Sequence, residues 1–254
     1  MKFYKYQGTG NDFIMIDGRV EKITLSASEI IQLCDRRFGI GADGIIIILK
    51  ENEESDFEMD YYNADGSQSF CGNGSRCAQA FAQYLGIIKE ESIFLAIDGM
   101  HEGKVLGEEY ATRMGDVSEI RHIGDDYFIN TGSPHYIQYV QDVDTVDVFK
   151  EGKAIRNSEA YKIEGTNVNF VSIHDDFLKV RTYERGVEGE TLSCGTGITA
   201  VAISFLHRQN LNQTSVAIKT KGGNLSIQLE RKGDVDFKNI WLLGPAQQVF
   251  EGVI

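Results

Sequence analysis

Short stretches in which apolar and polar residues alternate run through most of this 254-residue chain. Alternation over four to eight residues is typical of strands with one buried face. The first half predicts strands at 3–7, 13–17, 45–49 and 57–62, and the second half predicts them at 127–131, 136–140, 168–173, 178–183, 216–220, 225–229 and 240–243. The first two strands flank a glycine-containing segment, and we expect them to form a hairpin with a longer loop.

Three segments have the pattern of helices instead. Ser26 and Glu29 form a capping box ahead of apolar residues at helical spacing, which predicts a helix over about 27–36. The other two helices are predicted over 74–85 and from 196 to about 208. The last of these is apolar on nearly all sides, as expected for a helix enclosed by strands. Strands therefore outnumber helices, and the predicted fold class is α+β.

The charge and the N-terminal segment exclude several classes of protein. Acidic residues outnumber basic ones by 38 to 25, for a net charge of −13, which argues against broad binding to nucleic acids or anionic membranes because both require a basic surface. The N-terminus lacks the apolar segment of a secretory signal, and no apolar run approaches the ~18 residues that cross a bilayer. We therefore expect a cytoplasmic protein with neither a nucleic-acid nor a membrane partner.

One four-residue motif occurs twice, about half a chain length apart. The sequences CGNG at 71–74 and CGTG at 194–197 each follow a predicted strand and an acidic, glycine-containing loop, and each opens a helix that contains alanine. Because the surrounding pattern is repeated as well, we expect two related units, each built around one of these helices.

A cysteine directly before a helix is suited to proton transfer. The unpaired backbone N–H groups and the positive end of the helix dipole favour the thiolate and so lower the pKa of the thiol. The glycines that follow leave backbone N–H groups open to a carboxylate. If the sulfurs of Cys71 and Cys194 flank one carbon atom, a thiolate on one face and a thiol on the other can invert its configuration.

Other interpretations of the chemistry-bearing residues are weaker. Cys34 and Cys77 are expected to be buried apolar residues, and no two cysteines have the CxxC spacing of a zinc or redox motif. The five histidines show no metal-ligand spacing, so no metal is expected. The glycine-rich segment at 39–44 lacks the spacing and the preceding strand of a dinucleotide-binding motif. A non-catalytic amino-acid-binding protein and a redox-sensing pair of thiols remain alternatives to an enzyme.

Several motifs, taken together and in order, resemble those of the diaminopimelate epimerase family. They are GTGNDF at 8–13, DRRFGIGADG at 35–44, NADGS at 63–67, CGNGSRC at 71–77, YERG at 183–186 and CGTG at 194–197. The resemblance spans nearly the whole chain. It implies two pseudo-symmetric lobes, each a mostly antiparallel sheet or barrel wrapped around a central helix, with the active site in the cleft between them.

The family resemblance also implies an activity and an assembly. The first lobe is expected at 1–116, with 246–254 returning to it, and the second at 117–245. The implied enzyme is a homodimer that interconverts LL-2,6-diaminopimelate and meso-diaminopimelate without a cofactor, in the synthesis of lysine and peptidoglycan precursors. Another amino-acid racemase or epimerase of the same fold, of the proline, hydroxyproline or histidine type, is the alternative.

The resemblance assigns roles to individual positions. It implies that Cys71 and Cys194 are the catalytic acid and base. The implied substrate contacts are Asn11, Asn63, Gly72, Asn73, Asn167, Glu184, Arg185, Gly195 and Thr196. His135 and Glu184 match positions thought to tune the thiols. An arginine can bind a carboxylate through two parallel hydrogen bonds, which fits Arg185 to the distal end of a substrate with a second amino-acid head.

Three positions depart from the family's pattern. Ser133 stands where an asparagine is usual, which is expected to shorten one distal contact or to make it water-mediated. Gly44 stands where some members have glutamine, and Phe250 stands where many members have a tyrosine at the dimer contact. None of these departures involves the two cysteines of the repeated motif.

Overall fold

The computed structural model describes residues 1–21 and 23–254, which divide into two compact units. The first unit contains Met1–Thr112 and Gly244–Ile254, and the second contains Arg113–Leu243. The sequence analysis places the two divisions after residues 116 and 245 instead. The C-terminal segment thus belongs to the same unit as the N-terminus.

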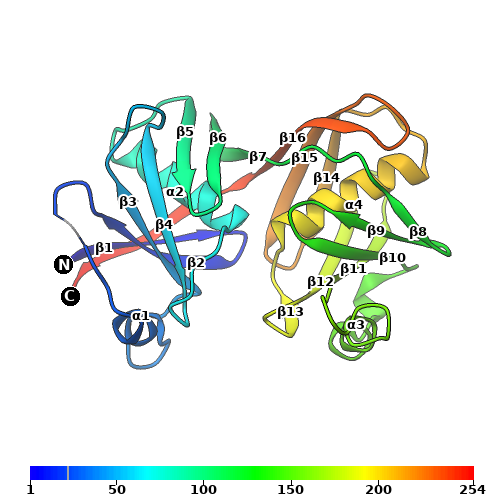
Figure 1. Cartoon of the computed structure of the whole chain (residues 1–254), viewed down its shortest axis with the longest axis horizontal. Helices are drawn as coiled ribbons and strands as arrows, with labels where there is room; N and C mark the ends of the chain where they lie inside the picture. The colour runs from blue at the N-terminus through cyan, green and yellow to red at the C-terminus, as the bar shows by residue number, and fades with distance from the viewer. Residues whose placement is uncertain (22) are drawn as a thin grey trace. The chain divides into compact units, whose positions relative to one another are not determined.

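Each unit has a long helix, a shorter helix and a series of strands (Figure 1). The elements of the first unit are β1 (Lys2–Gly8), β2 (Asn11–Asp17), α1 (Ala27–Cys34), β3 (Gly44–Leu49), β4 (Phe57–Asn63), α2 (Gly72–Tyr84), β5 (Glu91–Ala96), β6 (Gly99–Leu106), β7 (Glu109–Arg113) and β17 (Gln247–Val253). Those of the second unit are β8 (Arg121–Ile123), β9 (Asp126–Asn130), β10 (Pro134–Tyr139), a 3₁₀ turn (Val143–Thr145), α3 (Val148–Arg156), β11 (Asn167–Ile173), β12 (Leu178–Glu184), β13 (Gly189–Thr191), α4 (Gly195–Arg208), β14 (Ser215–Thr220), β15 (Gly223–Arg231) and β16 (Phe237–Pro245).

The strands of the two units pair in the same order. In the first unit, β1–β2 is antiparallel, β2–β3 parallel, β3–β4 antiparallel, β4–β5 parallel and β5–β6 antiparallel. In the second unit, β9–β10, β10–β11, β11–β12, β12–β14 and β14–β15 repeat that series. The short helices α1 and α3 occupy equivalent places, as do α2 and α4. The predicted α+β class and the predicted repeat are confirmed in the backbone topology.

The central sheet of the first unit is buried on both faces, which explains its apolar strands. Along β2, Phe13 and Met15 pack in the cluster formed around α2, whereas Ile14 and Ile16 pack in the cluster that contains α1. The strand β3 alternates in the same way, and its continuous apolar run is typical of a strand covered on both sides. In the second unit, α4 packs on one face and α3 on the other.

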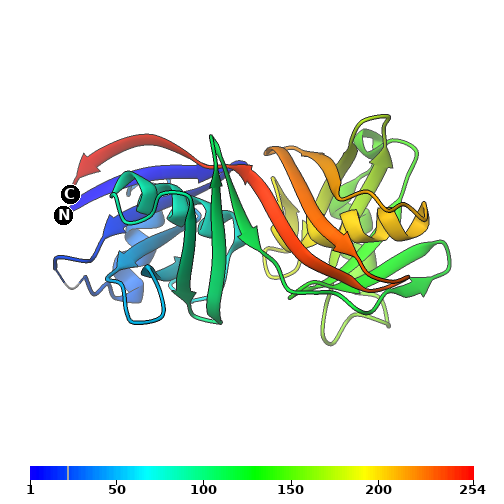
Figure 2. The same ribbon diagram turned by 90° about the horizontal axis from the view of Figure 1, so that it is seen from above.

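The N- and C-terminal strands of the chain lie side by side in the first unit (Figure 2). β1 and β17 are antiparallel, with Lys2 opposite Val253, and the amide of Ile254 donates to the carbonyl oxygen of Met1 at 3.0 Å. None of the helices in the described part of the chain combines the length and apolar character that crossing a bilayer requires.

Two local predictions are wrong in detail. The turn between β1 and β2 consists only of Thr9 and Gly10, with φ of 50° and 83°, where a longer loop was expected. A two-residue turn with both φ values positive matches the twist of a hairpin. The first helix ends at Cys34 rather than at about 36, because Asp35 is extended and its carboxylate accepts the amides of Arg37 and Phe38. The sequence analysis also did not predict β5–β8, α3, β13 or β17.

Candidate active site

Cys71 is the N-cap residue of α2, and its sulfur has both a donor and an acceptor beside it. The backbone amide of Gly74 points at Sγ at 3.4 Å, as in an N-cap whose side chain accepts a helix N–H. On another side, Sγ lies 3.5 Å from Oδ1 of Asn11, an atom that can only accept. The first contact favours the thiolate, and the second favours the thiol. Both protonation states of this cysteine therefore have a partner within the first unit.

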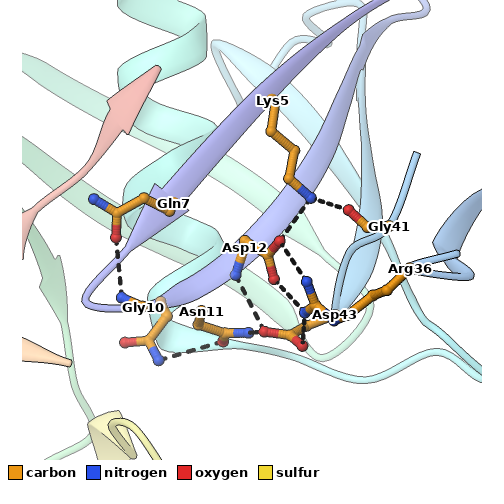
Figure 3. Close-up of polar contacts among 9 residues, drawn as sticks. Lys5, Gln7, Gly10, Asn11, Asp12, Arg36, Gly41 and Asp43 are labelled. Carbon is orange, nitrogen blue, oxygen red and sulfur yellow. Dashed lines mark hydrogen bonds and ion pairs between the residues drawn. The ribbon is translucent and has the colours of Figure 1, made fainter. Parts of the chain in front are cut away.

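The amide of Asn11 is held in one orientation by its neighbours (Figure 3). Its Nδ2 donates to Oδ2 of Asp43 at 2.6 Å, which leaves Oδ1 to face the cysteine. The same Oδ1 accepts a second hydrogen bond from Nδ2 of Asn73 at 3.3 Å. Asp43 is in turn paired with Arg36 at 2.7 Å. The predicted contacts Asn11 and Asn73 thus lie at hydrogen-bonding distance of one another, and Asn11 contacts Cys71.

An ion-pair cluster holds the start of β2 beside this asparagine (Figure 3). The carboxylate of Asp12 lies 2.7 Å from Nζ of Lys5 and 2.6 Å from Arg36, and the Lys5 ammonium also donates to the carbonyl oxygen of Gly41. Partial burial opposes ionisation of Asp12, but the hydrogen bonds from Arg36 and Lys5 outweigh it and lower the pKa of this carboxyl to about 2. Asp12 is therefore ionised at neutral pH, and its ion pairs position the segment that carries Asn11.

Arg76, which the sequence analysis did not assign to the site, is 0% exposed in the first two turns of α2. Its guanidinium donates to Oδ1 of Asn73 at 2.9 Å and to Oγ1 of Thr9 at 3.1 Å. Within the part of the chain that the structure describes, no acidic side chain lies within ion-pair distance of it. A buried arginine is normally paired with a carboxylate, whereas this one places its positive charge among neutral hydrogen-bond acceptors close to Cys71.

Cys194 is the N-cap residue of α4, with backbone angles close to those of Cys71: φ −126° and ψ 110° against −136° and 115°. Its surroundings differ. The Cys194 side chain is only 8% exposed, and it makes no capping hydrogen bond to an amide of α4. Its sulfur lies 3.5 Å from Oγ1 of Thr196. That hydroxyl is also 2.9 Å from Nε2 of His135, so the predicted residues His135, Thr196 and Cys194 are joined in one line of contacts.

His135 is fully buried and neutral. The pKa of this imidazole falls to about 3, mainly because the ring is buried and to a smaller extent because of the positive charge of Arg185. Its Nδ1 lies 3.1 Å from Nδ2 of Asn169, another residue that the sequence analysis did not assign. The alternating asparagines of β11, Asn167 and Asn169, are polar residues in a strand that is otherwise mostly apolar, and that pattern could have indicated both.

The remaining predicted contacts of the second unit form a separate group. Oδ1 of Asn167 accepts the amide of Arg185 at 2.9 Å, and its Nδ2 donates to Oγ of Ser133 at 3.0 Å. The exposed guanidinium of Arg185 donates to the carbonyl oxygen of Glu164 at 2.8 Å. Burial raises the pKa of Glu184, although a hydrogen bond with Thr191 opposes the rise. Ser133, one of the departures, thus holds the amide of Asn167.

Asn63 and Gly44 are two further positions of the first unit that the sequence singles out. Asn63, the last residue of β4, accepts from the Tyr61 hydroxyl at 2.8 Å and donates to Oγ of Ser67 and Ser69. Gly44 tolerates no side chain, because a Cβ there would lie 2.4 Å from the carbonyl oxygen of Tyr62. A glutamine at position 44 would require this backbone to move. Across residues 1–21 and 23–254, no group of three or more histidine, cysteine or acidic side chains is arranged to hold a metal ion.

The fold is shared with proteins of distant sequence. A crystal structure of a phenazine biosynthesis protein of the PhzF family from Bacillus anthracis matches with a TM-score of 0.79 at 13% identity, covering 100% of this chain and 99% of that one. A probable proline racemase from Agrobacterium radiobacter matches with a TM-score of 0.70 at 14% identity, covering 100% and 92%. At these identities the likeness establishes the fold alone, a fold found among racemases and related enzymes.

Sequence similarity identifies the family within this fold. The family model for diaminopimelate epimerase matches residues 3–118 and 127–249. The diaminopimelate epimerase of Flavobacterium psychrophilum is 48% identical over 259 residues, covering 100% of both chains, and that of Aquifex aeolicus is 40% identical, covering 99% of this chain and 97% of its own. The chain belongs to the diaminopimelate epimerase family and is an epimerase, which is a type of isomerase.

Proposed function

We propose that this chain interconverts LL-2,6-diaminopimelate and meso-diaminopimelate by proton transfer between two thiols. One cysteine, as the thiolate, removes the α-proton from one face of the substrate carbon. The other, as the thiol, delivers its proton to the opposite face, so the configuration inverts. After the reaction the first sulfur is protonated and the second is ionised, so the pair is ready to catalyse the reverse direction. No bond other than S–H and C–H changes, and the scheme needs no cofactor.

The observation that carries this proposal is the repeated geometry of Cys71 and Cys194. Each is the N-cap of the central helix of its unit, with nearly the same backbone angles. A helix N-terminus favours negative charge on the sulfur and offers unpaired N–H groups to an anion. The proposal adds that the two sulfurs face each other across a cleft between the units, as the two-face reaction requires.

The backbone after each cysteine fits the reacting carboxylate. Gly72 and Asn73 begin α2, and Gly195 and Thr196 begin α4. Their amides belong to the first turn, where helix N–H groups have no partner within the helix. Donors aimed at the α-carboxylate stabilise the negative charge that develops on it when the α-proton leaves.

The other end of the substrate requires a second set of charged and polar groups. We assign the distal carboxylate to Arg185 and the distal ammonium and carboxylate contacts to Asn63, Asn167 and Glu184. The backbone amide of Arg185 already donates to Oδ1 of Asn167 in the second unit, and the Arg185 side chain is exposed. A monocarboxylic amino acid such as proline would leave these groups without a partner, which favours diaminopimelate over the racemase alternative.

Incubation of the enzyme with LL-diaminopimelate in deuterated water tests the proposal. We expect deuterium at the α-carbon and accumulation of the meso form, resolved by chiral chromatography and mass spectrometry. A binding protein or a redox-sensing dithiol protein would incorporate none. Equal turnover of proline, hydroxyproline or histidine in a parallel panel would contradict the assignment of substrate.

We also propose a cytoplasmic homodimer acting in lysine and peptidoglycan precursor synthesis. The exposed apolar side chains of β17 support the dimer: Phe250 is 46% exposed, Val249 and Val253 more so, and Phe250 packs edge-on against Phe3 at 6.1 Å between ring centroids. Light scattering of the wild type and of Phe250→Asp tests it. A wild-type monomer at micromolar concentration would refute the dimer.

A further inference from the structure

Beneath the first turn of α4 lies a line of three buried polar side chains from three adjacent strands. His135 is on β10, Asn169 on β11 and Thr182 on β12. Oγ1 of Thr182 donates to Oδ1 of Asn169 at 2.9 Å, and Nδ2 of Asn169 lies 3.1 Å from Nδ1 of His135. The line continues from Nε2 of His135 to Thr196 and from Thr196 to Cys194.

The orientation of the Asn169 amide is held by the carbonyl oxygen of Tyr136 on one side and by the Thr182 hydroxyl on the other. Nδ2 also lies 3.1 Å from the carbonyl oxygen of Tyr136, which can only accept. If the amide were turned over, two oxygen atoms would meet there in a fully buried site. The nitrogen therefore faces both Tyr136 and the imidazole, and Nδ1 of His135 must accept a hydrogen bond from it.

This orientation decides the position of the imidazole proton. A neutral histidine with Nδ1 as acceptor carries its hydrogen on Nε2. Nε2–H then donates to Oγ1 of Thr196 at 2.9 Å. Since that hydroxyl accepts from the imidazole, its own hydrogen is available for the sulfur of Cys194 at 3.5 Å. With the other tautomer, Thr196 would donate to the imidazole and have no hydrogen left for the sulfur.

We infer that Asn169 is a positioning residue for Cys194: it holds His135 as the Nε2–H tautomer, so that the Thr196 hydroxyl donates to the Cys194 thiolate. The inference rests on the proposed role of Cys194 as a catalytic thiol. Asn169 does not contact the sulfur. It determines which group donates and which accepts in each hydrogen bond between His135 and Cys194.

The first unit shows that the fold itself does not require these polar side chains. The equivalent positions there are occupied by Phe13, Ile46 and Tyr61. Asn169 pairs with Thr182 across β11 and β12 exactly where Ile46 pairs with Tyr61 across β3 and β4. Phe13 and Ile46 lie against Gly74, the third residue of α2. His135 and Asn169 lie in the same way against Gly197, the third residue of α4. Packing beneath α2 is thus satisfied by two apolar side chains and a tyrosine, and these three described residues form no line of buried hydrogen bonds like that of the second unit.

The inference is tested first by the tautomer of His135. Nitrogen-15 NMR of histidine-labelled protein distinguishes the two tautomers and the imidazolium by their ring nitrogen shifts. We expect the Nε2–H pattern in the wild type at pH 7. An Nδ1–H pattern or an imidazolium would overturn the inference, whether or not the enzyme is active.

The second test is the reactivity of Cys194 in Asn169→Leu, a substitution of similar shape without a donor. Iodoacetamide labelling followed by peptide mapping measures the alkylation rates of Cys194 and Cys71 in the same sample. We expect the Cys194 rate to fall about tenfold relative to that of Cys71, because a hydrogen bond to an ionised sulfur is lost. Rescue by Asn169→Gln is not expected, since the longer side chain cannot keep the Tyr136 contact.

Two controls keep the outcome decisive. Ile46→Val, at the equivalent position of the first unit, should leave both alkylation rates within twofold. If Asn169→Leu does not fold, Thr182→Val removes only the bond to Oδ1 and should broaden or mix the His135 ring signals. An unchanged ratio of rates together with an unchanged tautomer in these variants would overturn the inference. Absence of deuterium exchange in the wild type would instead refute the proposed function and leave the tautomer result standing.

Discussion

The starts of α2 and α4 have the same backbone but opposite kinds of neighbours. Cys71 has an amide N–H, an acceptor oxygen of Asn11 and the buried charge of Arg76 nearby. Cys194 has the hydroxyl of Thr196, backed by a neutral, buried imidazole. The Cys71 site is partly exposed and has a guanidinium nearby, whereas the Cys194 site is more buried and its neighbouring imidazole is neutral. A repeated fold can therefore supply two thiols in equivalent places and still surround each with different side chains.

The difference follows from a few positions in equivalent places. Arg76, five residues after Cys71, corresponds to Thr199, which is also buried but only donates to the carbonyl oxygen of Gly195 at 3.0 Å. In the first unit, the buried polar group near the cysteine is on the helix. In the second unit, the buried polar groups near the cysteine are on the strands β10–β12. Both arrangements are compatible with the same strand pairing, so the backbone alone does not determine the side-chain chemistry around each cysteine.

The largest effect is expected from removing either sulfur. Cys71→Ala and Cys194→Ala should each lower epimerisation by about 10³-fold or more, because each removes a group that transfers a proton. Each variant should keep its thermal midpoint within a few degrees, and each should exchange deuterium into at most one of the two substrate epimers. Near-normal epimerisation by either variant would contradict the two-thiol scheme. Cys34→Ala, a buried cysteine of α1, serves as the control.

The apolar character beneath α2 is tested by placing the amide of the second unit into the first. Ile46→Asn should lower the free energy of unfolding by about 2–4 kcal/mol, because the buried amide meets Phe13 and finds no partner. Urea denaturation measures the change. Ile46→Val, which only shortens the side chain, should cost about 1 kcal/mol. Equal costs for the two variants would show that burial of a polar group is not what separates the units.

Substitution of Arg76 tests whether its charge distinguishes the Cys71 site from the Cys194 site. Arg76→Met should lower kcat/KM by about 10- to 100-fold, because it removes the donor that orients Asn73 and a positive charge close to Cys71. Thr199→Val at the equivalent position should change it less than about threefold. Steady-state kinetics at saturating and limiting substrate measure both. Similar losses in the two variants would mean that the charge has no special role.

The smallest expected effect is the part of the acid dependence of stability that arises from the ion pairs of Asp12 in the first unit. The pKa of Asp12 is lowered to about 2 from an ordinary value of 3.8, so its contribution is complete above pH 4 and is lost as the pH falls through 2. The loss amounts to at most about 2 kcal/mol. Unfolding of the wild type and of Asp12→Asn at pH 2 to 5 measures it. The two curves should converge at low pH, and parallel curves would contradict the assignment.

Much of the secondary structure could be predicted because local pattern determines it. The buried strand at 45–49, the capping box at Ser26 and the two helices that open with CGNG and CGTG are all present. Two kinds of missed element have a physical reason. β17 and β6 carry many exposed residues and little alternation, and α3 begins at an aspartate cap without a capping box. Such segments take their structure from their neighbours rather than from their own pattern.

The sequence by itself determined the repeat, the family and the place of the two cysteines at helix N-termini. These features depend on residue order and on local helix capping. Only the tertiary structure decided which side chains surround each sulfur. Asn169 is distant in sequence from the cysteine that it is inferred to position, and its role depends on strand register and on which way its amide points. Arg76 is only three residues from Asn73, but its complete burial depends on the strands around α2. Hydrogen-bond direction is set by the three-dimensional neighbours of a donor, and a linear pattern does not contain them.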